Sequence, residues 1–254
     1  MLDGDTLAWI GVACWCFVVA LLGTSIGIVL GTVRLPVLLL MASSPAAGAG
    51  ANVGVSAVSA AAASVTHIRA GRVNWRLAAW MTPPSMAGAL VGGYAAGVLP
   101  GRLLLVVIGS LLFAFGVRQL RRRPRAPDPH TNGRLNIRAA VVTGLLVGLL
   151  GGLVGLILST LRVPAMVSRV GETAHRAIGT NVIVGFMLGI AGVAGHLASG
   201  VDWDLFLVGS AASVPGSLVG SRLVGRLSER QLLNAIGAAL LIVGSATVLR
   251  GAVS

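Results

Sequence analysis

Lysine is absent from this chain, and charge of either sign is scarce. Only 10% of the 254 residues are charged, and all 19 basic residues are arginine. About a quarter of the residues of a soluble domain are charged, because water must solvate its outer surface. The chain has too few charges to cover a water-facing surface of its size, which excludes a soluble globular fold.

Cysteine and acidic residues are also few. Cys14 and Cys16 are two residues apart in one apolar segment, so a helix points them in different directions and neither a disulfide nor a metal site is expected. The seven carboxylates fall nearly all in predicted loops, and no two are set for acid–base work inside an apolar segment. We therefore expect no catalytic residue, no metal and no cofactor, and we predict that the protein is not an enzyme.

What is present is a series of long hydrophobic runs. Hydrophobic residues make up 56% of the chain, and the mean hydropathy is +0.92. Several uncharged stretches exceed the roughly 20 residues that a helix needs to cross the hydrocarbon core. These stretches are 6–33, 35–66, 77–101, 103–117, 139–161, 177–201, 205–221 and 231–249. The sequence predicts an all-α polytopic membrane protein with eight to ten transmembrane or part-crossing helices.

The arginines are placed in short loops between the apolar stretches. A net charge of +12 would suggest nucleic-acid binding in a soluble protein. In a membrane protein, basic loops are instead retained on the cytoplasmic side. We expect a multi-pass protein of the cell inner membrane, surrounded by lipid bilayer and without a nucleic-acid partner.

The two halves of the chain repeat one another. A shift of 128 or 129 residues brings matching residues into register over more than a hundred positions. The matches include Arg34 with Arg162, Asn52 with Asn181, His67 with His196, and Trp75 with Trp203. We predict a first transmembrane repeat at 1–117, a cytoplasmic Arg/Pro-rich linker at 118–138 and a second transmembrane repeat at 139–254.

Equivalent loops of the two repeats carry opposite charge. The loop at 67–76 contains three arginines, whereas its counterpart at 196–204 contains Asp202 and Asp204. If basic loops are cytoplasmic, these two loops lie on opposite faces of the membrane, and the repeats are inverted relative to one another.

Inversion requires an odd number of crossings in each repeat, although each repeat has four obvious apolar blocks. We expect the fifth element at 26–50, broken near the midplane by Pro36 and by the small residues at 43–50. Its counterpart is expected at 156–179.

Two arginines lie inside apolar segments, each two residues before a proline. Arg34 precedes Pro36, and Arg162 precedes Pro164. A charge at the bilayer centre costs about 2.5–3.5 kcal/mol or more, so it usually has a function. The alternative is an interfacial anchor whose charge reaches the headgroups. We predict that the two guanidiniums together bind one anion at the midplane, since only Glu172 is a nearby carboxylate by sequence.

Polar residues near the arginines complete the predicted site. Small residues precede Asn52 and Asn181, where the pattern predicts the start of the next helix, with free N–H groups facing the substrate. We expect substrate contacts from Asn52, Asn181, Thr180, Thr32 and Thr160. The alternative is ordinary capping or hydrogen bonding between helices.

A histidine follows each of these asparagines by 15 residues. That spacing is about 22 Å along a helix, which predicts that His67 and His196 lie far from the site and are dispensable for substrate binding. A gate or proton relay is the weaker interpretation, and an interfacial histidine the stronger one. Trp75 and Trp203 are expected to anchor the chain at the membrane interface.

These segments resemble the sulfite exporter TauE/SafE family of permeases. The family carries, twice, a Gly-rich segment ending in Pro, a Gly-Thr-Ser helix start and a His…Gly-x-Val-Asp-Trp turn. The closest matches here are Gly179-Thr-Asn181, His67…Gly71-Arg-Val-Asn-Trp75 and His196…Gly200-Val-Asp-Trp203. This chain has fewer glycines before each proline, an arginine after each Gly-rich segment, and asparagine in place of serine at both helix starts. The resemblance implies transport of sulfite, organosulfonates or related sulfur-containing anions, usually outward.

We therefore expect a secondary transporter, an exporter of small sulfur-containing anions that works by alternating access of two inverted repeats. No Walker motif is present, so a gradient supplies the driving force. The open alternatives are a channel or an importer for other small organic anions. A membrane-embedded hydrolase built on Ser25 and His67 is least favoured, because no nucleophile motif frames the serine. Formation of a homodimer is left open.

Overall fold

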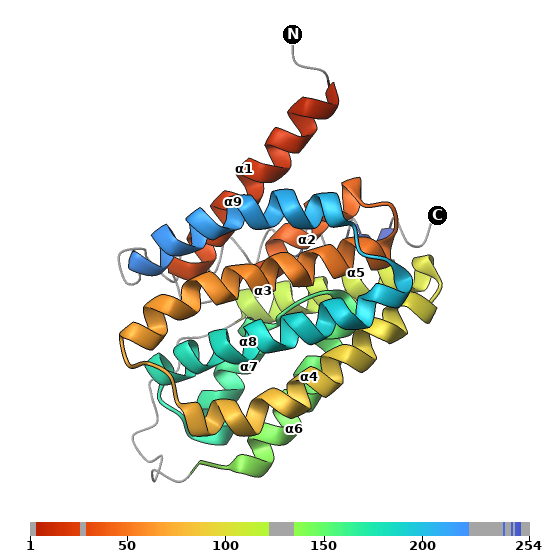
Figure 1. Cartoon of the computed structure of the whole chain (residues 1–254). Coiled ribbons are helices and arrows are strands. Elements are labelled where there is room, and N and C mark those ends of the chain that lie inside the picture. Colours follow the sequence, from red (N-terminus) through yellow and green to blue (C-terminus); the bar gives the residue numbers. More distant parts are fainter. Residues whose placement is uncertain are drawn as a thin grey trace.

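The computed structural model describes residues 4–25, 29–121, 135–223, 241, 245 and 247–249, and every regular element among them is helical (Figure 1). The helices are α1 (Gly4–Ser25), α2 (Gly31–Met41), α3 (Pro45–Arg69), α4 (Trp75–Val98), α5 (Gly101–Leu120), α6 (Ile137–Val154), α7 (Ser159–Ala165), α8 (Ala174–His196) and α9 (Trp203–Arg222). A π-helical turn, Met166–Val170, follows α7, and a 3₁₀ turn, Leu197–Ser199, follows α8. Most of the predicted linker and most of the predicted last apolar segment lie outside the described residues.

Four helices of the described ranges are long and apolar enough to cross a membrane. They cover Asp5–Ser25, Pro45–Arg69, Ile137–Val154 and Arg176–Ser199, and so correspond to α1, α3, α6 and α8. Shorter apolar helices cover Gly31–Met41 and Gly101–Ala114. The predicted total of eight to ten segments stays a prediction, because part of the second repeat lies outside the description.

Both repeats contain a short helix after a break. Of the two breaks predicted in the first repeat, the one at 43–50 is present at Ser43 and Ser44, between α2 and α3. In the second repeat, α6 ends at Val154 and is capped by Gly155, which has φ 70°. Leu158 also has a positive φ, 38°, before α7 begins. Only glycine fits position 155, because a Cβ there would also collide with the backbone of Ala49. In the first repeat, the prediction that Pro36 breaks the helix is wrong, since α2 continues to Met41. A proline inside a helix removes one backbone hydrogen bond and can kink the helix without ending it.

The helices α3 and α8 begin earlier than predicted. Ser44 caps α3 by accepting a hydrogen bond from the N–H of Ala47 at 3.1 Å, and α8 begins at Ala174. Asn52 and Asn181 are therefore each the eighth residue of their helix. The predicted helix starts just before these asparagines are wrong, because N–H groups lack a helical partner only in the first turn. The polar groups available at these positions are therefore the asparagine side chains and not free backbone N–H groups.

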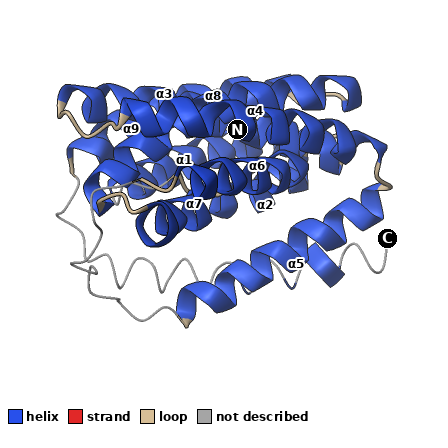
Figure 2. Cartoon of the chain, turned by 90° about the horizontal axis from the view of Figure 1, so that it is seen from below, coloured by secondary structure: helices blue, strands red, loops and turns tan. Residues whose placement is uncertain are grey.

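The helices pack in two layers, with helices of both repeats in each. Figure 2 shows α3, α4, α8 and α9 in one layer and α1, α2, α6 and α7 in the other, with α5 beyond the second. Across the layers, α4 of the first repeat packs on α6 of the second, and α9 of the second packs on α1 of the first. Each contact joins the fourth α-helix of one repeat to the first helix of the other.

Glycines make these two contacts close. A Cβ at Gly88 or Gly92 of α4 would collide with the backbone of α6, and a Cβ at Gly216 or Gly220 of α9 would collide with the backbone of α1. Small residues allow helix backbones to approach in this way inside a membrane. The four glycines are equivalent in the repeat, so both repeats use the same packing device.

The central helices α3 and α8 cross in opposite directions. Gly50, near the start of α3, lies against His196 at the end of α8. Ala57, near the middle of α3, contacts Gly189 of α8. Because the residue numbers rise along one helix as they fall along the other, the two helices are antiparallel.

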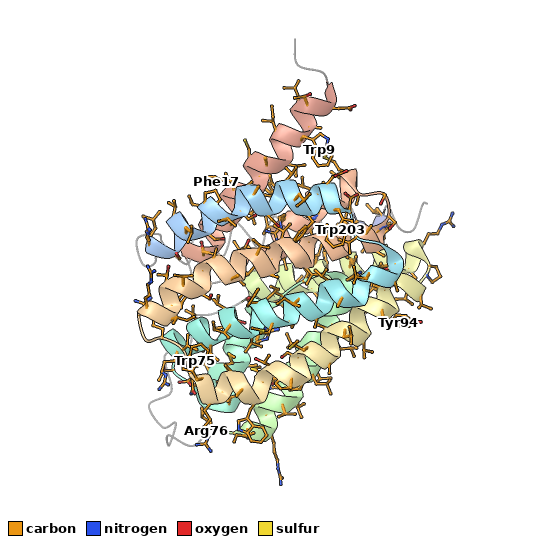
Figure 3. The ribbon with its side chains drawn as sticks, viewed as in Figure 1. Trp9, Phe17, Trp75, Arg76, Tyr94 and Trp203 are labelled. Carbon is orange, nitrogen blue, oxygen red and sulfur yellow. The ribbon has the colours of Figure 1, made fainter. Side chains whose placement is uncertain are left out.

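The two equivalent loops lie at opposite ends of α3. Asp202, in the loop before α9, donates its N–H to the carbonyl oxygen of Ala47 in the first turn of α3. The loop that leads to Trp75 instead follows Arg69, the last residue of α3, about 33 Å from Ala47 at 1.5 Å per residue. In Figure 3, Trp75 lies at the left of the bundle beside Arg76, and Trp203 lies toward the right. Both tryptophans are exposed.

Candidate functional site

Two arginines are the largest fully buried side chains of the described residues. Arg34 on α2 is 1% exposed, and Arg162 on α7 is 0% exposed. An interfacial anchor would keep its guanidinium at the headgroups, which requires exposure. Complete burial inside the bundle therefore disfavours the anchor interpretation for both.

Arg34 is held by side chains of its own repeat. Its Nε donates to Oδ1 of Asn52 at 2.9 Å, and its Nη2 donates to the carbonyl oxygen of Asn52 at 3.1 Å and to the hydroxyl of Ser56. The amide Nδ2 of Asn52 donates in turn to the carbonyl oxygens of Gly31, at 3.2 Å, and Gly155, at 2.7 Å. We call Arg34, Asn52 and Ser56 the first cluster. No nitrogen of Arg34 is among the described buried atoms without a partner.

The equivalent arginine of the second repeat has fewer partners. Nη1 of Arg162 donates to Oδ1 of Asn181 at 3.3 Å, and Nδ2 of Asn181 donates to the hydroxyl of Ser159 at 3.0 Å. We call these three residues the second cluster. Within the described part of the chain, Nε and Nη2 of Arg162 are buried without a hydrogen-bond acceptor.

The two clusters lie on opposite sides of the crossing of α3 and α8. Asn52 precedes Ala57 by five residues, and Asn181 precedes Gly189 by eight. Because the helices are antiparallel, these distances add, and the two asparagines are about 20 Å apart along the bundle. Each arginine contacts the asparagine of its own repeat. The binding of one anion by both guanidiniums stays a prediction.

The predicted threonines have separate environments. Thr180 accepts a hydrogen bond from the N–H of Asn74 at 2.9 Å, so its hydroxyl contacts the loop before α4 instead of the second cluster. The hydroxyl of Thr32 is buried without a partner among the described residues. Thr160 lies in the first turn of α7, and its side chain is outside the description.

Both histidines are buried in protein, although an interfacial position was the stronger expectation. Nε2 of His196 donates to the carbonyl oxygen of Gly152 at 2.9 Å, and its ring lies against Gly50, two residues before Asn52. The prediction that His196 lies far from the site is therefore wrong for the first cluster. The spacing along α8 fixes the distance of His196 from Asn181 but not from Asn52 on another helix. His67 is 2% exposed, and its Nδ1 has no partner within the described ranges.

A buried contact between the repeats was not expected from the sequence. The side-chain amide of Asn74 donates to Oε2 of Glu172, which is 6% exposed and precedes α8. The other carboxylate oxygen of Glu172 accepts the N–H of Thr173 at 2.9 Å. Glu172 is thus engaged with the loop of the first repeat and is not the counter-charge of Arg162.

The equivalent position in the other repeat makes a similar contact at the other end of α3. Oδ2 of Asp202 accepts the N–H of Ser43 at 3.3 Å, and Oδ1 accepts the N–H of Leu205 at 3.2 Å. The alignment of Asn74 with Asp202 in the repeat was the signal that could have predicted this pair. These two contacts tie the repeats together at opposite ends of the bundle.

The chemistry offered by the site is hydrogen-bond donation by a permanent cation. A buried guanidinium without an acceptor is unfavourable, and a negatively charged group with several oxygens would satisfy it. The described residues contain no group of three or more His, Cys, Asp or Glu side chains that could hold a metal. The arrangement is suited to binding an anion.

The comparisons with known proteins agree with a membrane function. The family described as Sulfite exporter TauE/SafE matches residues 12–247. The probable membrane transporter protein YtnM of Bacillus subtilis (strain 168) is 23% identical over 238 residues, which cover 90% of this chain and 79% of that protein. No solved structure matches. The family match includes both clusters and both contacts between the repeats.

Proposed function

Because the chain belongs to the sulfite exporter TauE/SafE family of membrane transporters, we propose that it moves small sulfur-containing anions, such as sulfite or organosulfonates, out of the cell. The observation that carries the choice of an anion is the complete burial of Arg34 and Arg162. Among the described residues, the hydrogen bonds of both guanidiniums go to amide and hydroxyl oxygens. A transported anion supplies the negative charge that these neutral partners do not.

The shape of the guanidinium favours oxyanions within this class. Its N–H donors lie in one plane and match two oxygens on the same atom. Sulfite and sulfonate groups carry such oxygen pairs, and they also keep their negative charge in the bilayer interior when it is compensated by the arginine. A hydrolase is not supported, since the hydroxyl of Ser25 donates to the carbonyl oxygen of Leu22 in its own helix.

The mechanism that we propose is alternating access of two inverted repeats. It is supported by the reciprocal contacts of α4 with α6 and of α9 with α1, and by the antiparallel pair α3 and α8. Equivalent loops at opposite ends of α3 are the arrangement that inversion requires. In this proposal the basic loop at 67–76 and the linker at 118–138 face the cytoplasm, and the loop at 196–204 faces outward.

The first prediction is saturable sulfite flux in proteoliposomes. We expect purified protein to carry sulfite down an imposed gradient, and taurine-like sulfonates to compete, because both present oxygen pairs to the same guanidinium. Flux is measured as sulfite release from loaded vesicles, with protein-free vesicles and acetate-loaded vesicles as controls. Folded protein that moves acetate as fast as sulfite would support the alternative of a less selective channel or importer.

A further inference from the structure

We propose that the transported anion binds at Arg162 of the second repeat and not at its equivalent, Arg34. The inference rests on the proposed function and deepens it, because it assigns the anion to one of two arginines that the sequence repeat makes equivalent. It follows from a serine and a glycine that change places between the two repeats.

The exchange is visible once the repeats are aligned. Arg34 and Asn52 are matched by an arginine and an asparagine in the second repeat, but the small residues beside them differ between the repeats. Position 31 is glycine where its equivalent at 159 is serine, and position 56 is serine where its equivalent at 185 is glycine. Each repeat therefore has one hydroxyl beside the arginine–asparagine pair, but on a different helix.

In the first repeat, the hydroxyl is on α3 and accepts from the arginine. Ser56 receives a hydrogen bond from Nη2 of Arg34. Gly31 leaves the space for this contact, since a Cβ at position 31 would lie 2.6 Å from the hydroxyl of Ser56. Gly31 and Ser56 thus form a matched pair that leaves Arg34 with partners inside its own repeat.

In the second repeat, the hydroxyl is on α7 and accepts from the asparagine instead. The hydroxyl of Ser159 accepts a hydrogen bond from the side-chain amide of Asn181. In the first repeat, the backbone carbonyl oxygen of Gly31 accepts the equivalent hydrogen bond from Asn52. Gly185 offers no side chain to Arg162, and Nε and Nη2 of that arginine have no acceptor in the described chain. The donors that are used inside the first repeat remain available in the second.

The side chain of Ile157 leaves no room for a side chain at position 185. A Cβ at position 185 would lie 2.8 Å from Cγ2 of Ile157 and 3.8 Å from Nη1 of Arg162. The equivalent of Ile157 in the first repeat is the smaller Val29. Ile157 therefore occupies the space that a serine at position 185 would need.

The free donors define the ligand chemistry. An unpaired cationic donor inside a bundle is unfavourable and is retained where a ligand supplies the acceptor. Nε and Nη2 lie on the same edge of the guanidinium, which matches two oxygens bound to one atom. The second cluster is thus suited to a small oxyanion, a class that includes the sulfite and sulfonates of the proposed function.

The test transfers the first arrangement into the second repeat. In the variant Ile157→Val/Ser159→Gly/Gly185→Ser, we expect Arg162 to adopt the arrangement of Arg34, so that the hydroxyl at position 185 accepts from Nη2, as Ser56 does, and competes with the anion. Sulfite affinity, measured by calorimetry on purified protein, should fall about ten- to hundredfold, the equivalent of one charge-assisted hydrogen bond. The matched control, Val29→Ile/Gly31→Ser/Ser56→Gly, makes the reverse exchange around Arg34, which removes an acceptor from that arginine, and it should not lower sulfite affinity.

A pair of single substitutions gives the same comparison without repacking. Arg162→Lys keeps the charge but loses the paired donors, so sulfite affinity should fall further in this variant than in Arg34→Lys. Wild-type affinity in both second-repeat variants, or equal losses in the two repeats, would overturn the assignment to Arg162. Folded wild-type protein that neither binds nor carries sulfite or a sulfonate would instead overturn the proposed function.

Discussion

At the scale of single residues, burial and partners separate two arginines that look alike in the sequence. Arg34 donates to Asn52 and Ser56, and removing it would leave buried acceptors without a partner. Arg162 has one described partner, at 3.3 Å, and two nitrogens without an acceptor. The stability of the empty protein should therefore depend on the first arginine more than on the second.

The corresponding prediction concerns thermal unfolding in detergent. Arg34→Ala should destabilise the protein by about 1.5–3 kcal/mol, because a cluster of hydrogen bonds to a charged group is lost. Arg162→Ala should leave the melting temperature unchanged or raise it, since it removes a buried charge that lacks a full set of partners. Tryptophan fluorescence during heating measures both. A lower melting temperature for Arg162→Ala than for Arg34→Ala would contradict the described difference in partners.

At the scale of helices, the fold depends on four glycines that bring α4 onto α6 and α9 onto α1. A side chain at these positions meets the backbone of the neighbouring helix, which cannot move aside as a flexible side chain can. The equivalence of the two contacts explains why the segments Gly88-Ala-Leu-Val-Gly92 and Gly216-Ser-Leu-Val-Gly220 match so closely. Packing, and not substrate binding, accounts for this part of the repeat.

We expect Gly92→Ala and Gly220→Ala each to destabilise the protein by about 1–3 kcal/mol through overpacking. Gly11→Ala is the matched control, because no atom lies within 4 Å of a Cβ at that helical position. The readouts are the monodisperse fraction in size-exclusion chromatography and the melting temperature. If Gly11→Ala were as harmful as the other two, close contact between the helices would not be the cause.

At the scale of the whole molecule, each repeat depends on the other for its packing. The first helix of each repeat packs on the fourth α-helix of the other. The buried hydrogen bond of Asn74 with Glu172 and the exposed one of Ser43 with Asp202 join the repeats at both ends of α3. Movement of one repeat against the other must therefore change contacts at both ends of the bundle.

The membrane topology tests the inverted arrangement directly. In a background with Cys14→Ser and Cys16→Ser, single substitutions Arg72→Cys and Asp202→Cys are labelled with a membrane-impermeant maleimide in intact cells. We expect labelling at position 202 from outside and at position 72 only after the cells are opened, because the basic loop is retained in the cytoplasm. Labelling of both positions from the same side would rule out inverted repeats.

The sequence by itself determined the class of protein, the repeat and the two arginines. The scarcity of charge and the length of the apolar stretches decide that a chain must be solvated by lipid, and neither depends on how the helices pack. The repeat is likewise detectable from the residue types alone. The family resemblance, carried by the turns Gly71-Arg-Val-Asn-Trp75 and Gly200-Val-Asp-Trp203, each preceded by a histidine, is confirmed by the match over residues 12–247.

Only the tertiary structure decided where those residues lie relative to one another. The antiparallel crossing of α3 and α8 separates Asn52 from Asn181 and brings His196 to Gly50, which helix spacing alone cannot predict. The free donors of Arg162 also depend on atoms from several segments. The physical reason is that hydropathy is a property of each segment, whereas a buried hydrogen bond requires donor and acceptor from different helices within about 3 Å.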